Sequence, residues 1–226
     1  MTIRPVDTYF QVMNQLPFYR RSFSYRYYNA TLTLIIINVA LYLLMMLVPR
    51  IFGYLALTPV LVVRERFIWQ VVTYMFLHDP RGIWHILINM LVLFIFGSRL
   101  EHRLGSSEFL LYYFITGIGA GIATVAVNWY SGMAAVPVVG ASGAIFGVML
   151  AFATFFPDTT IFVNFFIPLP ARIAVLVFTA IEIFSLIRRP GSGVAHLTHL
   201  AGFVFGYLYF LIRLGINPIR VLIRRR

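Results

Sequence analysis

Long apolar runs separated by short polar stretches dominate the chain. Six of these runs are long enough, or nearly long enough, to cross a bilayer as helices, which takes about 20 residues. We place them at residues 30–49, 83–99, 109–130, 142–156, 170–187 and 195–213. The pattern predicts an all-α polytopic membrane protein, in which residues 30–213 form a bundle of six transmembrane helices.

The longest connection, residues 50–82, mixes aromatic side chains with arginines. Its apolar stretches are too short and too interrupted to span, so we expect an interfacial element in the outer headgroup region. Arginines also mark both ends of the chain. We expect residues 1–29 to form a basic cytoplasmic or interfacial segment and residues 214–226 a basic cytoplasmic tail. No apolar core followed by a cleavage site precedes the first run, so no removable signal peptide is expected.

The composition supports a membrane protein and indicates which partners its arginines contact. Hydrophobic residues make up 61% of the chain and charged residues 11%, whereas about a quarter of a soluble domain is charged. The net charge of +11 would suggest nucleic acid in a soluble protein. Here the arginines flank apolar runs, which favours anionic lipid headgroups and no nucleic acid. The absence of cysteine excludes disulfides and thiolate metal sites.

The distribution of arginines predicts the orientation in the membrane. An even number of spans places both termini on one side, and the side richer in arginine is cytoplasmic. With both termini inside, twelve arginines are cytoplasmic and six are outside, so we expect cytoplasmic termini. The cytoplasmic set is Arg4, Arg20, Arg21, Arg26, Arg99, Arg103, Arg172, Arg213, Arg220, Arg224, Arg225 and Arg226, and the outer set is Arg50, Arg64, Arg66, Arg81, Arg188 and Arg189.

Ser142 opens the fourth run, which is short for a membrane span. About 15 helical residues cover roughly 22 Å, against a hydrocarbon core of roughly 30 Å. We therefore expect Ser142 below the outer surface, at a helix N-terminus in a cavity that water reaches. The free N–H groups there suit a serine that attacks a carbonyl, provided that a base is near. The small residues of the run equally fit close helix packing, with the serine bonded to its own helix.

His199 is the favoured base. It lies about five residues into the sixth run and so at the expected depth of Ser142. Gly202 and Gly206 follow His199 by three and seven residues and lie on the same helix face. We expect this face to pack against two glycines of the fourth run. His196, one turn nearer the headgroups, competes for the role. The four helix-packing glycines are Gly143, Gly147, Gly202 and Gly206.

His85 and Asn89 are four residues apart and share one face of the second run. Either they form an interhelical hydrogen bond or they join Ser142 in one polar layer. His78 is expected to act as a capping or loop residue, and His102 as a solvated loop residue.

No acid is expected near the serine. Glu182 falls in the middle of the fifth run, where we expect an interhelical bond.

Three motifs in this order resemble those of the rhomboid family of intramembrane serine proteases, in its six-span bacterial form. They are HxxxN on the second run, GxSG at the start of the fourth and HxxGxxxG on the sixth. The stretches LALTP, TYMFLH and LEHRLGSSEFLLYY are weaker similarities. The residues that carry the three motifs are His85 and Asn89, Gly140 to Gly143, and His199, Gly202 and Gly206.

The resemblance implies roles for these residues. Ser142 would be the nucleophile and His199 the general base and acid, as a dyad with no carboxylate partner. His85, Asn89 and the backbone N–H of Ser142 would bind the oxyanion, and no cofactor or metal is implied. Substrate would enter sideways, between the second and fifth spans. Family members often carry Trp-Arg in the first connection, where this chain has Trp69-Gln70.

The predicted function is that of a serine endopeptidase that cuts peptide bonds in or near transmembrane segments of membrane proteins. A helical substrate must unwind locally, because a helix hides its carbonyls. One alternative is a catalytically inactive rhomboid-like membrane-protein binder, although the chain keeps both members of the dyad. The other is a small transporter or channel, although the polar residues stop halfway across. We expect a bacterial plasma membrane, with the mitochondrial inner membrane as the alternative.

Overall fold

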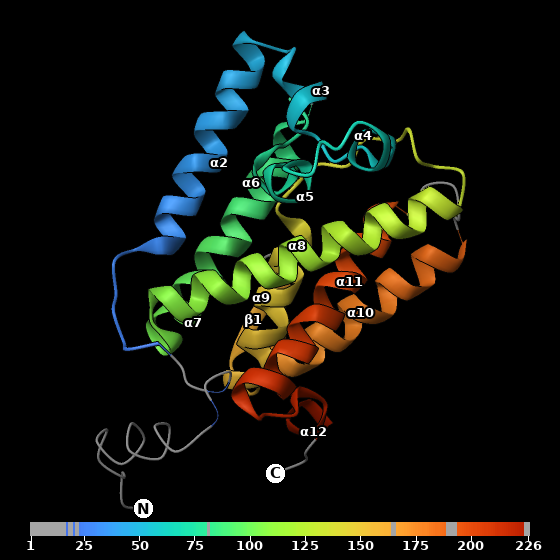
Figure 1. The fold of residues 1–226 in the computed structure, drawn as a ribbon. Coiled ribbons are helices and arrows are strands. Elements are labelled where there is room, and N and C mark those ends of the chain that lie inside the picture. Colours follow the sequence, from blue (N-terminus) through green and yellow to red (C-terminus); the bar gives the residue numbers. More distant parts are fainter. Residues whose placement is uncertain are drawn as a thin grey trace, which may run out of the picture.

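The chain forms a bundle of helices with one small β-hairpin (Figure 1). The computed structural model describes residues 17, 20, 23–80, 82–163, 166–188 and 194–223. Its elements are α2 (Ala30–Leu47), α3 (Ile51–Leu55), α4 (Pro59–Arg64), α5 (Gln70–Thr73), η2 (Tyr74–Phe76), α6 (Ile83–Val92), η3 (Leu93–Gly97), α7 (Ser98–Leu104), α8 (Ser106–Tyr130), α9 (Ser142–Phe155), β1 (Thr160–Val163), β2 (Ile167–Pro170), α10 (Ala171–Arg188), α11 (Val194–Tyr209), η5 (Phe210–Leu214) and α12 (Pro218–Ile223).

Helices occupy each of the six predicted runs. Within the described residues, four helices are long and apolar enough to cross a membrane: Ala30–Leu47, Ile83–Leu104, Ser106–Tyr130 and His196–Leu214. As expected, α9 is shorter, with 14 residues. The 18 residues of α10 include three charged ones, Arg172, Glu182 and Arg188.

The second helix continues further than expected. The second run was expected to end at residue 99, but residues 100–104 continue the helix as part of α7, which follows the π-turn η3. The charged Glu101 fits there because it is buried and fully engaged. Its carboxylate accepts the backbone N–H groups of Ala30 at 2.6 Å and Thr31 at 2.9 Å, and the hydroxyl of Ser106. The acid thus pairs with donors that the start of α2 leaves free.

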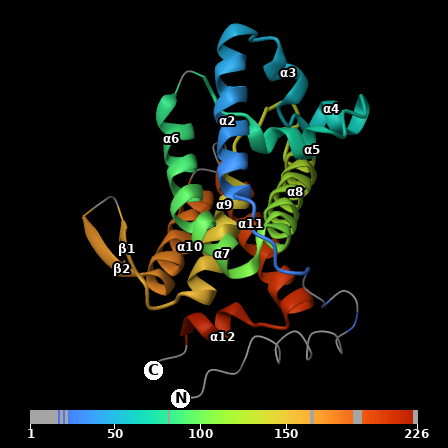
Figure 2. The same ribbon diagram turned by 90° about the vertical axis from the view of Figure 1, so that its left-hand side faces the viewer.

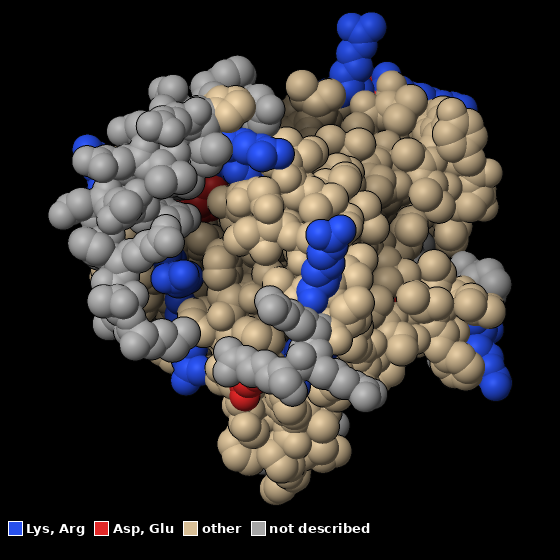
Figure 3. Space-filling model, turned by 90° about the horizontal axis from the view of Figure 1, so that it is seen from below, with Lys and Arg blue, Asp and Glu red and all other residues tan. Residues whose placement is uncertain are grey.

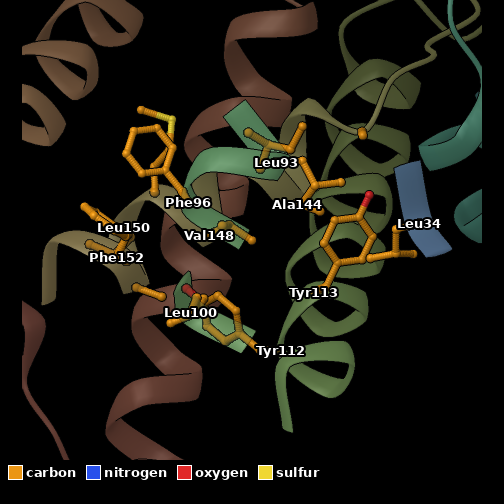
Figure 4. Close-up of a cluster of buried hydrophobic side chains, with 14 of the residues drawn as sticks. Leu34, Leu93, Phe96, Leu100, Tyr112, Tyr113, Ala144, Val148, Leu150 and Phe152 are labelled. Carbon is orange, nitrogen blue, oxygen red and sulfur yellow. The ribbon is translucent and has the colours of Figure 1, made fainter. Parts of the chain in front are cut away.

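α9 lies inside the bundle and forms its centre. Most of its side chains are buried, and it packs against α8, α11 and α10. Figure 4 shows part of this core, in which side chains of α8, α9 and the η3 segment meet. A helix that is apolar on all sides belongs inside a bundle, so the helix that carries Ser142 is held from every direction.

A buried ion pair ties α8 to the end of α11. The Nε–H group of Arg213 donates to Oε1 of Glu108 at 2.6 Å, and its Nη2 group donates to Oε2 at 2.9 Å. The Tyr209 hydroxyl donates to Oε1 of the same carboxylate. Bidentate pairing of this kind is strong and directional. This contact was not expected, because Arg213 was interpreted only as a topology signal.

The connection between α2 and α6 contains only short helices, α3, α4, α5 and η2, and lies at one end of the bundle (Figure 1). Gln70, at the position where the resemblance implies arginine, is buried and anchors this connection. Its side-chain oxygen accepts the N–H of Thr58 at 3.0 Å, and its nitrogen donates to the carbonyl of Tyr54 at 3.2 Å. The Trp69 ring nitrogen donates to that carbonyl at 3.0 Å. An amide therefore supplies the anchoring.

Residues 160–163 and 167–170 form a pair of strands that was not expected. β1 and β2 pair in antiparallel register, with Thr160 opposite Pro170 and Val163 opposite Ile167. The hairpin projects from the bundle between α9 and α10 (Figure 2). Its strands have four residues each, too few for alternation of polar and apolar residues to be visible in the sequence.

Residues 23–29, which precede α2, and α12 lie at the same end of the bundle (Figures 1 and 2). Figure 3 views this end, where arginines are scattered over a mostly uncharged surface. The expected tail contains α12, which buries Pro218 and Leu222. Seven arginines of the orientation argument lie outside the described residues: Arg4, Arg21, Arg81, Arg189, Arg224, Arg225 and Arg226.

Glycines let α11 approach α9 closely. A side-chain carbon on Gly202 would lie 1.9 Å from the carbonyl oxygen of Gly143, and one on Gly206 would lie 3.4 Å from the Cα atom of Gly147. We expect Gly202→Ala to force the helices apart and to cost about 1–3 kcal/mol or more, as overpacking does. Thermal unfolding in detergent measures the loss.

The matched control is Gly53→Ala in α3, where no atom lies within 4 Å of the added carbon. The control should unfold within a degree or two of the unmodified protein. Equal unfolding temperatures for the two variants would contradict the close contact.

Candidate active site

Ser142 is the first residue of α9, and the backbone before it is fixed in place. Gly140 has φ +124°, a conformation that residues with side chains rarely adopt. Its N–H donates to the carbonyl of Tyr74 at 2.9 Å. A side-chain carbon here would also lie 3.2 Å from Nε2 of His85 and 3.7 Å from Oγ of Ser142. The bare glycine therefore brings His85 and Ser142 around one small space.

His199 faces the serine. Its Nε2 lies 2.8 Å from Oγ of Ser142, at hydrogen-bond distance. The imidazole stacks on the ring of Phe146, with centroids 4.2 Å apart and an angle of 7° between the planes. Thr198, the preceding residue, lies 2.7 Å from Thr124 of α8 through their hydroxyls. Packing of α11 on α8 and α9 thus fixes the height and the plane of the His199 ring.

Asn89 is buried and His85 is exposed on the same helix. The Asn89 side-chain nitrogen lies 3.1 Å from Nε2 of His78, and the rings of His78 and His85 are 5.1 Å apart. His78 does lie in a loop, as expected, but it is fully buried there. The expectation of a simple loop residue missed its contact with Asn89.

Burial, and to a smaller extent the neighbouring His85, lower the pKa of His78 to about 3. His78 is therefore neutral at physiological pH. A neutral ring can accept a hydrogen bond from the Asn89 amide, whereas a charged ring could not. His78 thereby orients Asn89, and the TYMFLH stretch was the signal that could have indicated it.

The expectation that no acid lies near the serine is wrong. Oε1 of Glu182, on α10, lies 3.1 Å from Nδ1 of His199, and Oε2 lies 2.6 Å from Nδ1 of His196. The interhelical bond expected of Glu182 therefore reaches the candidate base itself. His196 faces this carboxylate, whereas the ring nitrogen next to Ser142 belongs to His199. The sequence missed the arrangement because packing of α10 on α11 creates it.

These three side chains are also of types that bind metal ions. Ligand atoms of Glu182, His196 and His199 all lie within 4.8 Å of one another. Both carboxylate oxygens already contact a ring nitrogen, so paired side chains account for the cluster without an ion. His102 lies elsewhere, exposed on α7 and stacked on Tyr27, rather than in the expected loop.

Comparison with known proteins identifies the family. The family model described as Rhomboid domain matches residues 65–216. The chain belongs to the rhomboid family. The match begins in the first connection and ends just after η5, so it includes every residue of the candidate site.

Curated relatives carry rhomboid names. This rhomboid is 36% identical to "Rhomboid protein 1, mitochondrial" of Saccharomyces cerevisiae over 132 residues, which are 56% of the chain and 37% of the relative. It is 35% identical to "RHOMBOID-like protein 1" of Arabidopsis thaliana over 162 residues, 70% of the chain and 38% of the relative. Identity to "Rhomboid protease GluP" of Bacillus subtilis is 40% over 81 residues, 36% of the chain and 14% of the relative.

The chain thus spans well under half the length of these relatives. The matched family and the apolar helices make it an integral membrane protein of a family that includes proteases.

Proposed function

We propose that this rhomboid is an intramembrane serine endopeptidase that cuts peptide bonds in or near transmembrane segments of other membrane proteins. One observation carries the proposal: Ser142 Oγ lies 2.8 Å from Nε2 of His199 at the N-terminus of the buried helix α9. A hydroxyl within hydrogen-bond reach of a neutral imidazole is the arrangement that activates a serine. The alternative is a catalytically inactive membrane-protein binder, and fluorophosphonate labelling distinguishes the two.

The reaction follows from this contact. Ser142 Oγ attacks the scissile carbonyl carbon while its proton passes to Nε2 of His199. The imidazolium then gives the proton to the leaving amine, and the C–N bond breaks to leave an ester on Ser142. Water, deprotonated by the same ring, attacks the ester carbon. The ring returns this proton to Oγ of Ser142 as the ester C–O bond breaks, and the new carboxyl end is released. Every proton is accounted for by one histidine, without a cofactor.

Three donors would bind the oxyanion. They are the backbone N–H of Ser142 at the start of α9, the exposed ring of His85 and the side-chain amide of Asn89. A helix N-terminus favours negative charge. The Asn89 amide has two hydrogens, so one can bind His78 while the other remains for the substrate.

We expect Asn89→Ala to lower kcat/KM by about 10²–10³-fold, because one oxyanion donor is lost, and to leave a weak residual rate. Cleavage of a single-span fusion protein with small residues at the outer end of its helix measures this. Asn38→Ala is the matched control, since Asn38 is a buried asparagine of α2 whose amide bonds Leu34 of its own helix. Equal losses in both variants would assign Asn89 to helix packing.

The number of spans and their orientation in the membrane are inferred from the sequence. We infer six spans, with residues 1–29 and 214–226 on the cytoplasmic side against anionic headgroups, in a bacterial plasma membrane. Substrate helices would enter between α6 and α10 and unwind near small residues, which weaken a helix. Water would reach Ser142 from the outer side, because α9 is too short to fill the bilayer.

Labelling with a fluorophosphonate–rhodamine probe tests the proposal without a known substrate. The probe should modify Ser142 in the intact protein in detergent, and peptide mapping should find no other labelled serine. Folded protein that takes up no label would favour the inactive binder.

A further inference from the structure

Three contacts hold the imidazole of His199. Nε2 faces Ser142 at 2.8 Å, and the ring plane stacks on Phe146. Nδ1 faces Oε1 of Glu182 at 3.1 Å. Glu182 is 9% exposed and lies one helix away, on α10. The nucleophile therefore lies beside one nitrogen of the candidate base, and a buried carboxylate lies beside the other.

We propose that Glu182 is a positioning residue for His199, so that the site works as a Ser142–His199–Glu182 triad instead of a dyad. This inference rests on the proposed function. An ionised carboxylate only accepts hydrogen bonds, so it selects the ring form with hydrogen on Nδ1. That form leaves the lone pair of Nε2 directed at the serine hydroxyl. Glu182 touches no reacting atom and acts through the ring alone.

The second role of Glu182 is electrostatic. When His199 takes the proton of Ser142, the ring gains a positive charge in a protein interior, where opposite charges attract more strongly than in water. The carboxylate at 3.1 Å compensates this charge. In the resting site the N–H of Nδ1 is not aligned for a full hydrogen bond. Such contacts often tighten only in the reacting complex.

His196 contacts the same carboxylate but does not reach the serine. Its Nδ1 lies 2.6 Å from Oε2, the oxygen that does not face His199. The two rings approach edge to face, with centroids 6.5 Å apart. Glu182 thus contacts two histidines on successive turns of α11, and only His199 connects it to Ser142.

The test compares Glu182→Gln with the unmodified protein in fluorophosphonate–rhodamine labelling. Glutamine keeps the size of the side chain but lacks the charge. We expect kinact to fall about tenfold to a hundredfold, the lower part of the range for general-base assistance, while KI stays within about twofold. Glu182→Asp, which keeps the charge on a shorter side chain, should recover part of kinact. Unchanged unfolding temperatures would separate positioning from structural support.

His196→Ala is the matched control, because it removes the other contact of Glu182 and leaves Oε1 beside His199. Its kinact should stay within about threefold of the unmodified value, which is roughly 0.7 kcal/mol of barrier. Equal kinact for Glu182→Gln and unmodified protein would overturn the triad. So would equal losses in Glu182→Gln and His196→Ala, because they would show that the cluster only joins the helices.

Two further comparisons separate the triad from a metal site and from failure of the proposed function. All labelling is done with a chelator present, and labelling that needed added Zn²⁺ would replace the triad by a metal site. If the unmodified protein takes up no label at Ser142, the proposed function itself fails. If it labels and Glu182→Gln labels equally fast, only the triad fails.

Discussion

Replacing Ser142 with alanine is expected to abolish peptide cleavage and fluorophosphonate labelling together. Alanine removes the only atom that forms the bond to the scissile carbonyl, and no other hydroxyl lies at 2.8 Å from His199 in the described structure. Loss of a serine nucleophile costs serine proteases on the order of 10⁴-fold or more in kcat. Gel-based detection of the cut fusion protein and rhodamine fluorescence at the same protein concentration measure both effects.

Folding is expected to survive this change. Ser142 makes no side-chain cap on α9, and alanine is a strong helix former. Thermal unfolding should therefore shift by no more than a few degrees. Ser131→Ala, at an exposed position just after α8, is the matched serine control and should retain full labelling. Cleavage by Ser142→Ala at the unmodified rate would refute the mechanism.

Replacing His199 with alanine is the second large effect. The change removes the group that takes the proton from Ser142 and returns it to the leaving amine, a contribution of about 10²–10⁴-fold. We expect cleavage to fall below detection and labelling to fall in proportion. The defect should lie in kcat, because the ring acts on the reacting atoms and not on the remote parts of the substrate.

Comparing His199→Ala with His196→Ala shows which of the two histidines acts on Ser142. Both residues are half-buried histidines on α11, three residues apart, and both contact Glu182. Only His199 reaches Ser142. Loss of both activities in His196→Ala, with His199→Ala unaffected, would exchange their roles and contradict the geometry.

Much of the bundle was predictable from local patterns. Runs of apolar residues predict helices wherever they are long, and the structure has helices in all six predicted ranges. The short fourth run correctly placed Ser142 at the start of a short helix. The spacing of Gly202 after His199 correctly indicated the face of α11 that lies against α9. Each of these inferences uses residues within a few positions of one another.

The errors concern residues that depend on distant partners. Residues 100–104 were expected in a connection because they are charged, yet Glu101 is buried against the start of α2. Gln70 departs from the family pattern, but its amide bonds with the backbone of Tyr54 and Thr58. For Glu101 the charge of the side chain suggested exposure, and a partner far along the chain satisfied it instead.

The sequence by itself determined that the protein belongs in a membrane and where its helices lie. It also indicated that the helix that begins at Ser142 packs against the helix that carries His199 and its two glycines. Hydrophobic period and local spacing carry that information. Only the tertiary structure decided that Glu182 reaches His199 and that His78 reaches Asn89. Those contacts depend on how α10 rotates against α11 and how the first connection folds beside α6. Rotation and depth arise from the packing of whole helices, which no local pattern records.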